Sequence, residues 1–490
     1  MIDRRHMLGT SALGLAGLMA GCAVPPLTRL GTADSASGAD VFANTGVSSG
    51  RSMPTPLLAN LHERSFYYFW DTTDPATGLA PDRGPTPSFA SIAAIGFALT
   101  AYPIGVENGW ITRDQARVRT LTTLQFFAAA PQGNSQNDDS GIHGLFYHFL
   151  GTTKGHRFAR AELSTVDTAL LMGGVLFAQS WFDSDHPDEV RIRALAEQLY
   201  AAIDWTWIVK RPPFLAMGWH PESGFIPHDW NIYNEAMLLY ILAIGSPTHA
   251  LPPQTWDAWT SRFDAQWTDR WGGEPYIHFG PMFVHQYSHC WIDFRDIRDR
   301  YITSKGITYF ENSRRAVRAQ RAYAIANPGG FTGYGAEIWG LTACDGPGDF
   351  TATIGGRKRE FFSYSARGPG DRDDGTIAPT AAAASFAFEP ELSRQAIEAM
   401  HDRYGASIYG KYGFLDAFNP TLTATTQPLK HGRVIPGTGW VDDDYLGIDQ
   451  GPIVVMMENW RTGLVWKTMK RNPHIRRGLQ RAGFTGDWLA

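Results

Sequence analysis

Hydrophobic and polar positions follow two different helical patterns along this chain. In the first pattern, apolar residues recur three and four positions apart and charged residues occupy the other side, which predicts amphipathic helices around a core. Six segments show it: Leu57–Trp70, Arg113–Phe127, Pro187–Ile208, Pro253–Trp267, Tyr309–Ala326 and Pro390–Tyr404. In the second pattern, apolar or small residues occupy every side, which is typical of enclosed helices. Six segments show this one: Ser88–Ala101, Ser164–Phe182, Asn234–Ile244, Phe283–Phe294, Pro379–Phe388 and Gln450–Trp460.

The order of these segments predicts an all-α (α/α)6 toroid, a six-hairpin barrel in which inner and outer helices alternate. Local signals support several helix starts. Thr112 with Gln115 and Ser164 with Asp167 are capping-box patterns. A linker-like composition appears only before about residue 52, so residues 53–490 are predicted to form one domain.

The connections that lead into the inner segments are long, whereas those that leave them are mostly short. Long loops inside a compact domain usually carry function. Because these loops lead into the same ends of the inner helices, we expect them to cover one face, above the helix N-termini. They are Asp71–Pro87, Ala128–Leu163, Val209–Tyr233, Thr268–Met282, Asn327–Ala378 and Gly405–Asp449.

Two acidic residues begin inner segments on that face. Glu235 precedes the apolar run that starts at Met237, and Asp167 holds the equivalent place after Ser164. The dipole and the free N–H groups of a first helical turn favour a negative charge, so either acid alone could serve only the helix. The repetition of the arrangement beneath the long loops favours a shared functional cavity.

The acids, aromatic residues and arginine in the loops of that face suit a neutral carbohydrate as the ligand of the cavity. The formal net charge is −5, so the chain does not have the excess of positive charge that is typical of proteins that bind nucleic acid. Aromatic residues make up 13% of the chain, and their faces stack on sugar rings while acids and arginine bond to hydroxyls. The predicted substrate contacts are Trp219, Tyr233, Tyr287, His289, Trp291, Asp345, Arg367, Asp374, Trp440 and Asp449.

Metal-ligand patterns are weak, and we expect no metal and no cofactor. His285 and His289 are four residues apart, as in one-face zinc sites, but no glutamate base lies between them. The run Asp442-Asp443-Asp444 lacks the alternate spacing and the glycine of a calcium loop.

The N-terminus predicts export. Residues 1–22 combine a charged start, a short apolar stretch and small residues before Cys22, as in a lipoprotein signal peptide in which Cys22 receives the lipid. Residues 23–52 are predicted to be a flexible tether, which places the protein in the periplasm or on the cell surface, anchored to a bacterial membrane. The Sec and twin-arginine routes both stay open, as does pairing of Cys290 with Cys344.

Several long motifs resemble a known family. They are Phe69–Asp71, Thr77–Arg83, Glu162–Ala169, Tyr233–Met237, His285–His289, Gly340–Pro347, Asp373–Thr380 and Tyr445–Pro452. Through these motifs, most of residues 57–484 resembles the bacterial glycoamylase-like domain family, whose members include endo-β-1,2-glucanases. The resemblance implies an (α/α)6 barrel, action on β-glucan and an inverting mechanism.

The resemblance also implies catalytic roles. Asp167 and Glu235 match acidic positions implicated in the family's catalysis. We predict Glu235 as the general acid or acid-side residue and Asp167 as the base-side or water-positioning carboxylate, with Glu162, Asp345 and Asp449 as rivals for the second role. Inverting pairs of carboxylates are about 6.5–9.5 Å apart, or relay through water. Loop lengths set whether the groove is open or closed, so endo and exo action both stay open.

Two other functions fit the same residues. A polysaccharide lyase could use His289, Tyr287 and Arg367 against a uronate, although paired acids would repel that anionic substrate. A glycan-binding lipoprotein without catalysis would use the same aromatic and acidic side chains.

Overall fold

A computed structural model describes residues 50–489 of the chain. The predicted signal peptide, the lipidation site at Cys22 and nearly all of the predicted tether lie outside these residues. Within the described part, no helix is long and apolar enough to cross a membrane.

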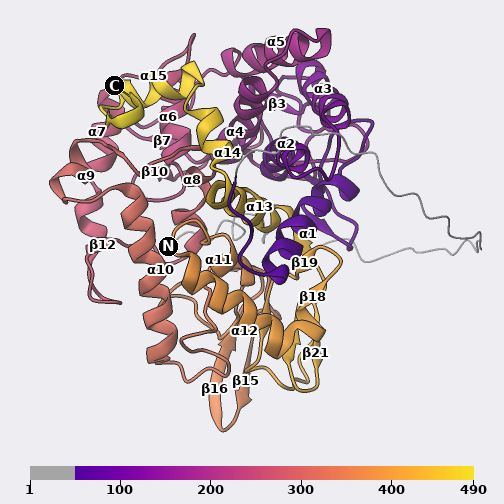
Figure 1. The fold of residues 1–490 in the computed structure, drawn as a ribbon, viewed down its shortest axis with the longest axis vertical. Coiled ribbons are helices and arrows are strands. Elements are labelled where there is room, and N and C mark those ends of the chain that lie inside the picture. Colours follow the sequence, from indigo (N-terminus) through magenta and orange to yellow (C-terminus); the bar gives the residue numbers. More distant parts are fainter. Residues whose placement is uncertain (1–49, 490) are drawn as a thin grey trace, which may run out of the picture.

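The outer layer consists of the amphipathic segments predicted from the sequence, and Figure 1 shows α3 and α5 along its upper edge and α10 and α12 below. The capping box of Thr112 and Gln115 is present at the start of α3. The expected range of α10 is reproduced at both ends. The outer helices are α1 (Pro56–Thr72), α3 (Arg113–Ala129), α5 (Pro187–Ala201), α7 (Gln254–Thr260), α10 (Tyr309–Ala326) and α12 (Pro390–Ile408).

The inner helices are enclosed by the outer ones. All residues of α2 up to Gly105 are buried, as are all residues of α6. The segments that are apolar on every side are therefore the buried helices, as predicted. The alternation of the two layers gives the (α/α)6 toroid that the sequence predicts. The inner helices are α2 (Ile92–Glu107), α4 (Thr165–Trp181), α6 (Met237–Gly245), α8 (Tyr287–Trp291), α11 (Pro379–Ala383) and α13 (Gly447–Arg461).

Several predicted helices are shorter than expected. The segment Phe283–Phe294 is divided by Gln286, whose φ of −112° departs from helical values, into a 3₁₀ turn and α8. The inner segment at Pro379 is helical only to Ala383. Outer helices α5 and α7 also end early, at Ala201 and Thr260. An apolar run shows that a segment is buried, but it does not separate a helix from a buried turn.

Helices α2 and α4 pack with their backbones in contact. A Cβ atom on Gly174 would lie 2.1 Å from the carbonyl oxygen of Gly96, and one on Gly96 would lie 2.3 Å from the carbonyl oxygen of Leu170. Both helices begin at a serine cap, Ser91 and Ser164, whose side chains accept a backbone N–H. The close approach therefore brings two inner helix N-termini to the same level.

Short strands join the long loops into a ring above those N-termini. The first pair, β2 (Ala90–Ser91) with β5 (Phe149–Leu150), ties the loop before α2 to the loop before α4. The second, β6 (Leu163–Ser164) with β8 (Gly218–His220), ties the loop before α4 to the loop before α6. Pairing of β1 (Arg83–Gly84) with β23 (Tyr445–Leu446) joins the first and last loops. The expected gathering of the loops on one face is confirmed.

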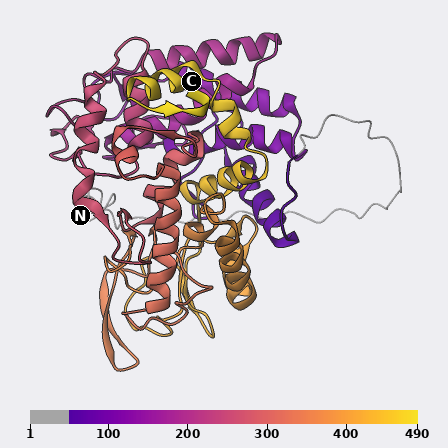
Figure 2. The ribbon, with the colours of Figure 1, turned by 60° about the vertical axis from the view of Figure 1, so that its left-hand side comes forward.

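Smaller elements complete the structure, and in Figures 1 and 2 the β15–β16 hairpin projects from its lower end. The other strands are β3 (Gly141–Ile142), β4 (Leu145–Phe146), β7 (Leu215–Ala216), β9 (Gly224–Phe225), β10 (Asp229–Trp230), β11 (Trp267–Thr268), β12 (Tyr276–Ile277), β13 (Ile297–Arg298), β14 (Ala343–Cys344), β15 (Phe350–Ile354), β16 (Arg357–Phe361), β17 (Ser365–Ala366), β18 (Tyr409–Gly410), β19 (Gly413–Phe414), β20 (Phe418–Asn419), β21 (Arg433–Ile435), β22 (Gly439–Val441) and β24 (Thr485–Gly486). The other helices are α9 (Arg300–Ser304), α14 (Leu464–Met469) and α15 (Pro473–Arg481), with 3₁₀ turns at Phe263–Gln266, Met282–His285 and Asp487–Leu489.

Candidate active site

A cavity of about 410 Å³ opens among the loops above the N-terminal ends of the inner helices. Four carboxylates line it: Glu162, Asp167, Asp229 and Glu235. Trp230 and Phe283 supply aromatic surface to the same cavity. The predicted convergence of Asp167 and Glu235 on one cavity is therefore confirmed, whereas their chemical roles stay predictions.

Asp167 is held by hydrogen bonds at the start of α4. The Ser164 hydroxyl donates to Asp167 Oδ2 at 2.5 Å and accepts the Asp167 backbone N–H. His148 Nε2 lies 3.5 Å from the same Oδ2, and His148 Nδ1 lies 2.8 Å from Glu162 Oε1. One imidazole thus connects two of the four carboxylates of the cavity, and the side chain of Asp167 is fixed from two sides.

Glu235 lies in a turn directly before α6, not on its first turn as the sequence predicted. The Asn234 side chain accepts the backbone N–H of Ala236 in a turn, and α6 begins after it, at Met237. Ser288 of α8 donates its hydroxyl to the Glu235 carbonyl oxygen at 3.1 Å and accepts the N–H of Leu238 at 3.0 Å. These bonds fix the turn from below and place the carboxyl group at the cavity.

Some cavity residues were not predicted as site residues. Trp230 donates its ring N–H to Thr165 Oγ1 at 2.9 Å, which orients the indole. Arg211 also lines the cavity, and it is paired with Asp229 at 2.6 Å. Trp230 could have been found, because it lies in the long loop that ends at Glu235. The pairing of His148 with Glu162 had no sequence signal, since it depends on how one loop folds back on itself.

Most of the predicted aromatic substrate contacts are instead part of the packed interior. Tyr233 and Trp291 have no exposed surface, and the Trp291 ring N–H is bonded to Thr100 Oγ1 at 3.0 Å. His289 is buried with Nε2 3.1 Å from Ser313 Oγ. Trp440 is fully buried as well. A side chain with no exposed face cannot stack on a sugar ring, so these residues are corrected to structural roles.

Trp219 and Tyr287 also lie apart from the cavity lining. The Trp219 ring packs at 5.6 Å from the ring of Trp207, and that of Tyr287 at 5.1 Å from Phe283.

Burial lowers the pKa of His285 and of His289 to about 3, so both imidazoles are neutral at pH 7.

Arg367 and Asp374, predicted to bind substrate, form a buried ion pair. Arg367 Nε donates to Asp374 Oδ1 at 2.8 Å, and neither side chain has exposed surface. Arg367 also donates to the carbonyl oxygen of Cys344 at 2.9 Å, so the pair holds the loop before α11 in shape.

Cys290 and Cys344 are both free, buried thiols, and they do not form the disulfide that the sequence left open.

Replacing Arg367 by Met should destabilise the protein by about 3–5 kcal/mol, because it leaves the buried carboxylate of Asp374 without its partner. The melting temperature, measured by circular dichroism, should fall by several degrees. Arg300→Met is the matched control, since Arg300 is 82% exposed in its pair with Asp257. An Arg367→Met variant that melts with the control would contradict the structural role of the pair.

The remaining predicted contacts, Asp345 and Asp449, belong to a second group of acids. We call it the Asp345 cluster; its members are Asp345, Asp416, Asp442, Asp444 and Asp449, with Arg83 and His431. Arg83 Nη1 donates to Asp345 Oδ2 at 2.5 Å. Burial and the neighbouring carboxylates raise the pKa of Asp416 to about 6 and that of Asp449 well above its usual range. Asp449 is on the first turn of α13, and its raised pKa favours the protonated form.

The protein is an (α/α)6 toroid with carboxylates above the N-termini of its inner helices. Carboxylates are the groups that glycoside hydrolases use, so the fold and the cavity are typical of that class of enzyme. The chain belongs to the Glycoamylase family, whose model, described as "Putative glucoamylase", matches residues 227–473.

Similar proteins extend over most of the chain. It is 30% identical over 459 residues to an exo β-1,2-glucooligosaccharide sophorohydrolase (non-reducing end) of Parabacteroides distasonis. That match covers 87% of this chain but 57% of the relative, so this chain spans little more than half the relative's length.

Two solved structures show the same fold. One, from Bacteroides uniformis and described as a "putative glucoamylase", has a TM-score of 0.76 and 33% identity, and the match covers 89% of this chain and 98% of that one. The other is an endo-β-1,2-glucanase of Chitinophaga pinensis in complex with sophorotriose and glucose. Its TM-score is 0.73 at 29% identity, with 88% of this chain and 99% of that chain covered.

Proposed function

We propose that this protein is a glycoside hydrolase that cleaves β-1,2-linked glucan by an inverting mechanism. The observation that carries the proposal is the presence of Asp167 and Glu235 in one cavity of a fold shared with β-1,2-glucan-cleaving relatives. Hydrolysis of a glycosidic bond requires one carboxylic acid and one carboxylate, and both can come from this pair.

In the proposed reaction, Glu235 is the general acid and Asp167 the general base. Glu235 gives its proton to the glycosidic oxygen as the bond from that oxygen to the anomeric carbon breaks. Asp167 accepts a proton from the water whose oxygen forms the new bond to the anomeric carbon from the opposite face. His148 and Ser164 keep the Asp167 carboxylate in place. The product then carries an α-anomer at its new reducing end.

The structure disfavours the lyase alternative. Two of its candidate groups, His289 and Arg367, are buried and bonded to other side chains. Four carboxylates line the cavity, and one of them, Asp229, is paired with Arg211, which also lines it. Such a cavity repels a uronate. Export and the lipid anchor at Cys22 stay sequence predictions.

Incubation of the purified protein with linear β-1,2-glucan should release short β-1,2-linked oligosaccharides. Chromatography gives their sizes: sophorose alone indicates exo action, and a ladder of lengths indicates endo action. Proton NMR of the first products should show the α-anomer. Starch and a polyuronate serve as controls and should stay intact. A first product with the β-anomer would contradict the inverting mechanism, and an uncleaved β-1,2-glucan would contradict the proposed substrate.

A further inference from the structure

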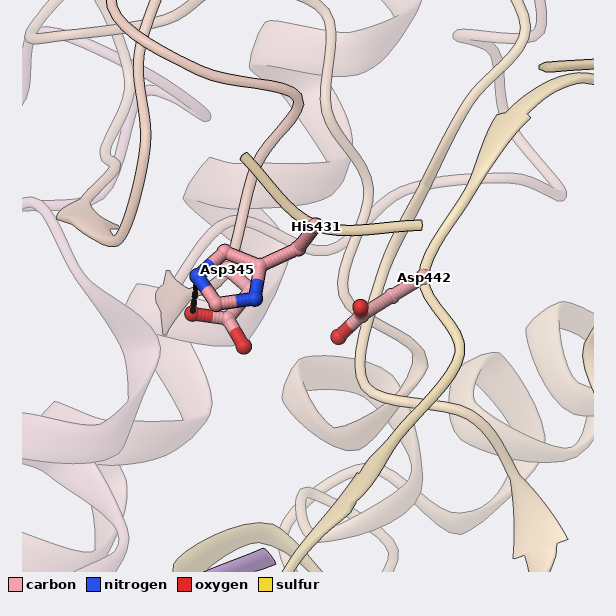
Figure 3. Close-up of side chains that lie close together, drawn as sticks. All are labelled: Asp345, His431 and Asp442. Carbon is pink, nitrogen blue, oxygen red and sulfur yellow. Dashed lines mark ion pairs between the residues drawn. The ribbon is translucent and has the colours of Figure 1, made fainter. Parts of the chain in front are cut away.

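We propose that Asp345, His431 and Asp442 form a binding site for one divalent cation, and that Zn²⁺ is the ion that fits it. Each residue offers one ligand atom, and these atoms all lie within 4.8 Å of one another. Figure 3 shows the three side chains directed toward a common space from three separate segments. None of the three lines the cavity that holds Glu235.

The backbone holds two of the donors side by side. His431 precedes β21 and Asp442 follows β22, and these strands pair with Arg433 opposite Val441. The Trp440 ring N–H donates to the His431 carbonyl oxygen at 2.8 Å. Gly432, with φ of +67°, allows the close crossing, since a Cβ there would lie 2.1 Å from the Val441 oxygen. The third donor, Asp345, follows β14 in the loop before α11.

Asp442 supplies the observation that points to a ligand. Its side chain is 1% exposed, and Oδ1 accepts the backbone N–H of Asp443 at 2.8 Å. Oδ2 has no hydrogen-bond partner among the described residues. A buried carboxylate oxygen without a partner is costly, and a coordinated cation would satisfy it.

The charge around the site is also unbalanced. Asp345, Asp416, Asp442, Asp444 and Asp449 are all nearly or fully buried in the Asp345 cluster. Arg83 is the cluster's one arginine, 2.5 Å from Asp345 and 3.8 Å from Asp444. One guanidinium cannot balance five carboxylates, so the group binds a cation or retains protons.

Geometry and donor type select the ion. His431 Nε2 lies 3.8 Å from Asp345 Oδ1. Two ligands of a tetrahedral zinc ion lie about 3.4 Å apart, given bonds of about 2.0–2.1 Å, so this pair needs only a small contraction, and the pairs with Asp442 start within 4.8 Å. The other oxygen of Asp345 is held by Arg83, an outer partner of the kind that orients metal ligands. One imidazole and two carboxylates suit Zn²⁺, whereas Ca²⁺ prefers six to eight oxygens. The ion would clamp the loop before α11 to the loop before α13.

Isothermal titration of the full chain, freed of metal by chelator, tests the site without any glucan. Zn²⁺ should bind with a stoichiometry near one, more tightly than Ca²⁺, and should raise the melting temperature. Asp442→Asn and His431→Ala should each weaken Zn²⁺ binding by more than about 100-fold. Replacing a residue that only hydrogen-bonds to a metal ligand costs up to about 100-fold, and loss of a ligand itself should cost more. Asp443→Asn is the matched control, because Asp443 neighbours the site, is paired with Arg433 and is outside the donor set.

Three outcomes would overturn the site as proposed. They are no heat from Zn²⁺ with a protein whose circular dichroism is native, binding that survives in Asp442→Asn, and tighter binding of Ca²⁺ than of Zn²⁺. Because titration measures no hydrolysis, failure of this site and failure of the proposed glucanase function are seen in separate experiments.

Discussion

Glu235→Gln should lower kcat on β-1,2-glucan by about 10²- to 10⁴-fold while the dissociation constant for oligosaccharide stays nearly unchanged. Glutamine has the shape of the acid and keeps its hydrogen-bonding capacity, but it has no proton to give to the glycosidic oxygen. Steady-state kinetics gives the first quantity and calorimetric titration of the variant gives the second. Glu360→Gln is the matched control, because Glu360 is exposed on β16.

The leaving group offers a sharper test of the acid role. An aryl β-sophoroside whose phenol is a good leaving group needs little protonation, so Glu235→Gln should cleave it far closer to the wild-type rate than it cleaves the glucan. Equal losses on both substrates would show that Glu235 does something other than donate a proton. Unchanged turnover of the glucan would contradict a catalytic role altogether.

Local sequence patterns were sufficient for the parts of the site that local structure determines. The apolar runs located the inner helices, and the acids at their starts, Asp167 and Glu235, do reach one cavity. The exact place of Glu235 was not predictable, because the turn that holds it is also fixed by Ser288 of the distant helix α8. The predicted helix start, Asn234, is about one turn too early, and Glu235 therefore lies before the first turn of α6.

Aromatic residues were the least predictable part. Tyr233 and Trp291 occur in loop and helix contexts similar to that of Trp230, yet only Trp230 lines the cavity. Whether an aromatic ring meets ligand or core depends on neighbours from distant segments, as with Trp291 and Thr100. For the same reason the sequence predicted no metal site, whereas folding brings Asp345 beside His431 and Asp442 from separate loops.

Asp167→Asn should lower kcat on the glucan by about 10²- to 10⁴-fold, like Glu235→Gln, but the aryl sophoroside should not restore the rate. Removal of the base leaves the attacking water without a group to accept its proton. A better leaving group does not replace that proton acceptor. Asparagine can still accept the Ser164 hydroxyl that Asp167 accepts, so the fold of the α4 N-terminus should persist. Kinetics on the two substrates, with circular dichroism as the check on folding, measure the effect.

The decisive comparison for the base is Asp449→Asn, because Asp449 is the rival acid on the first turn of another inner helix. Burial and the neighbouring carboxylates raise the pKa of Asp449, which favours the protonated form, and a protonated carboxyl cannot accept a proton from water. Asp449 also lies outside the lining of the cavity that holds Glu235. Asp449→Asn should therefore keep most of the glucanase activity that Asp167→Asn loses. The reverse pattern would move the base to the Asp345 cluster and make the substrate groove run from Glu235 toward α13.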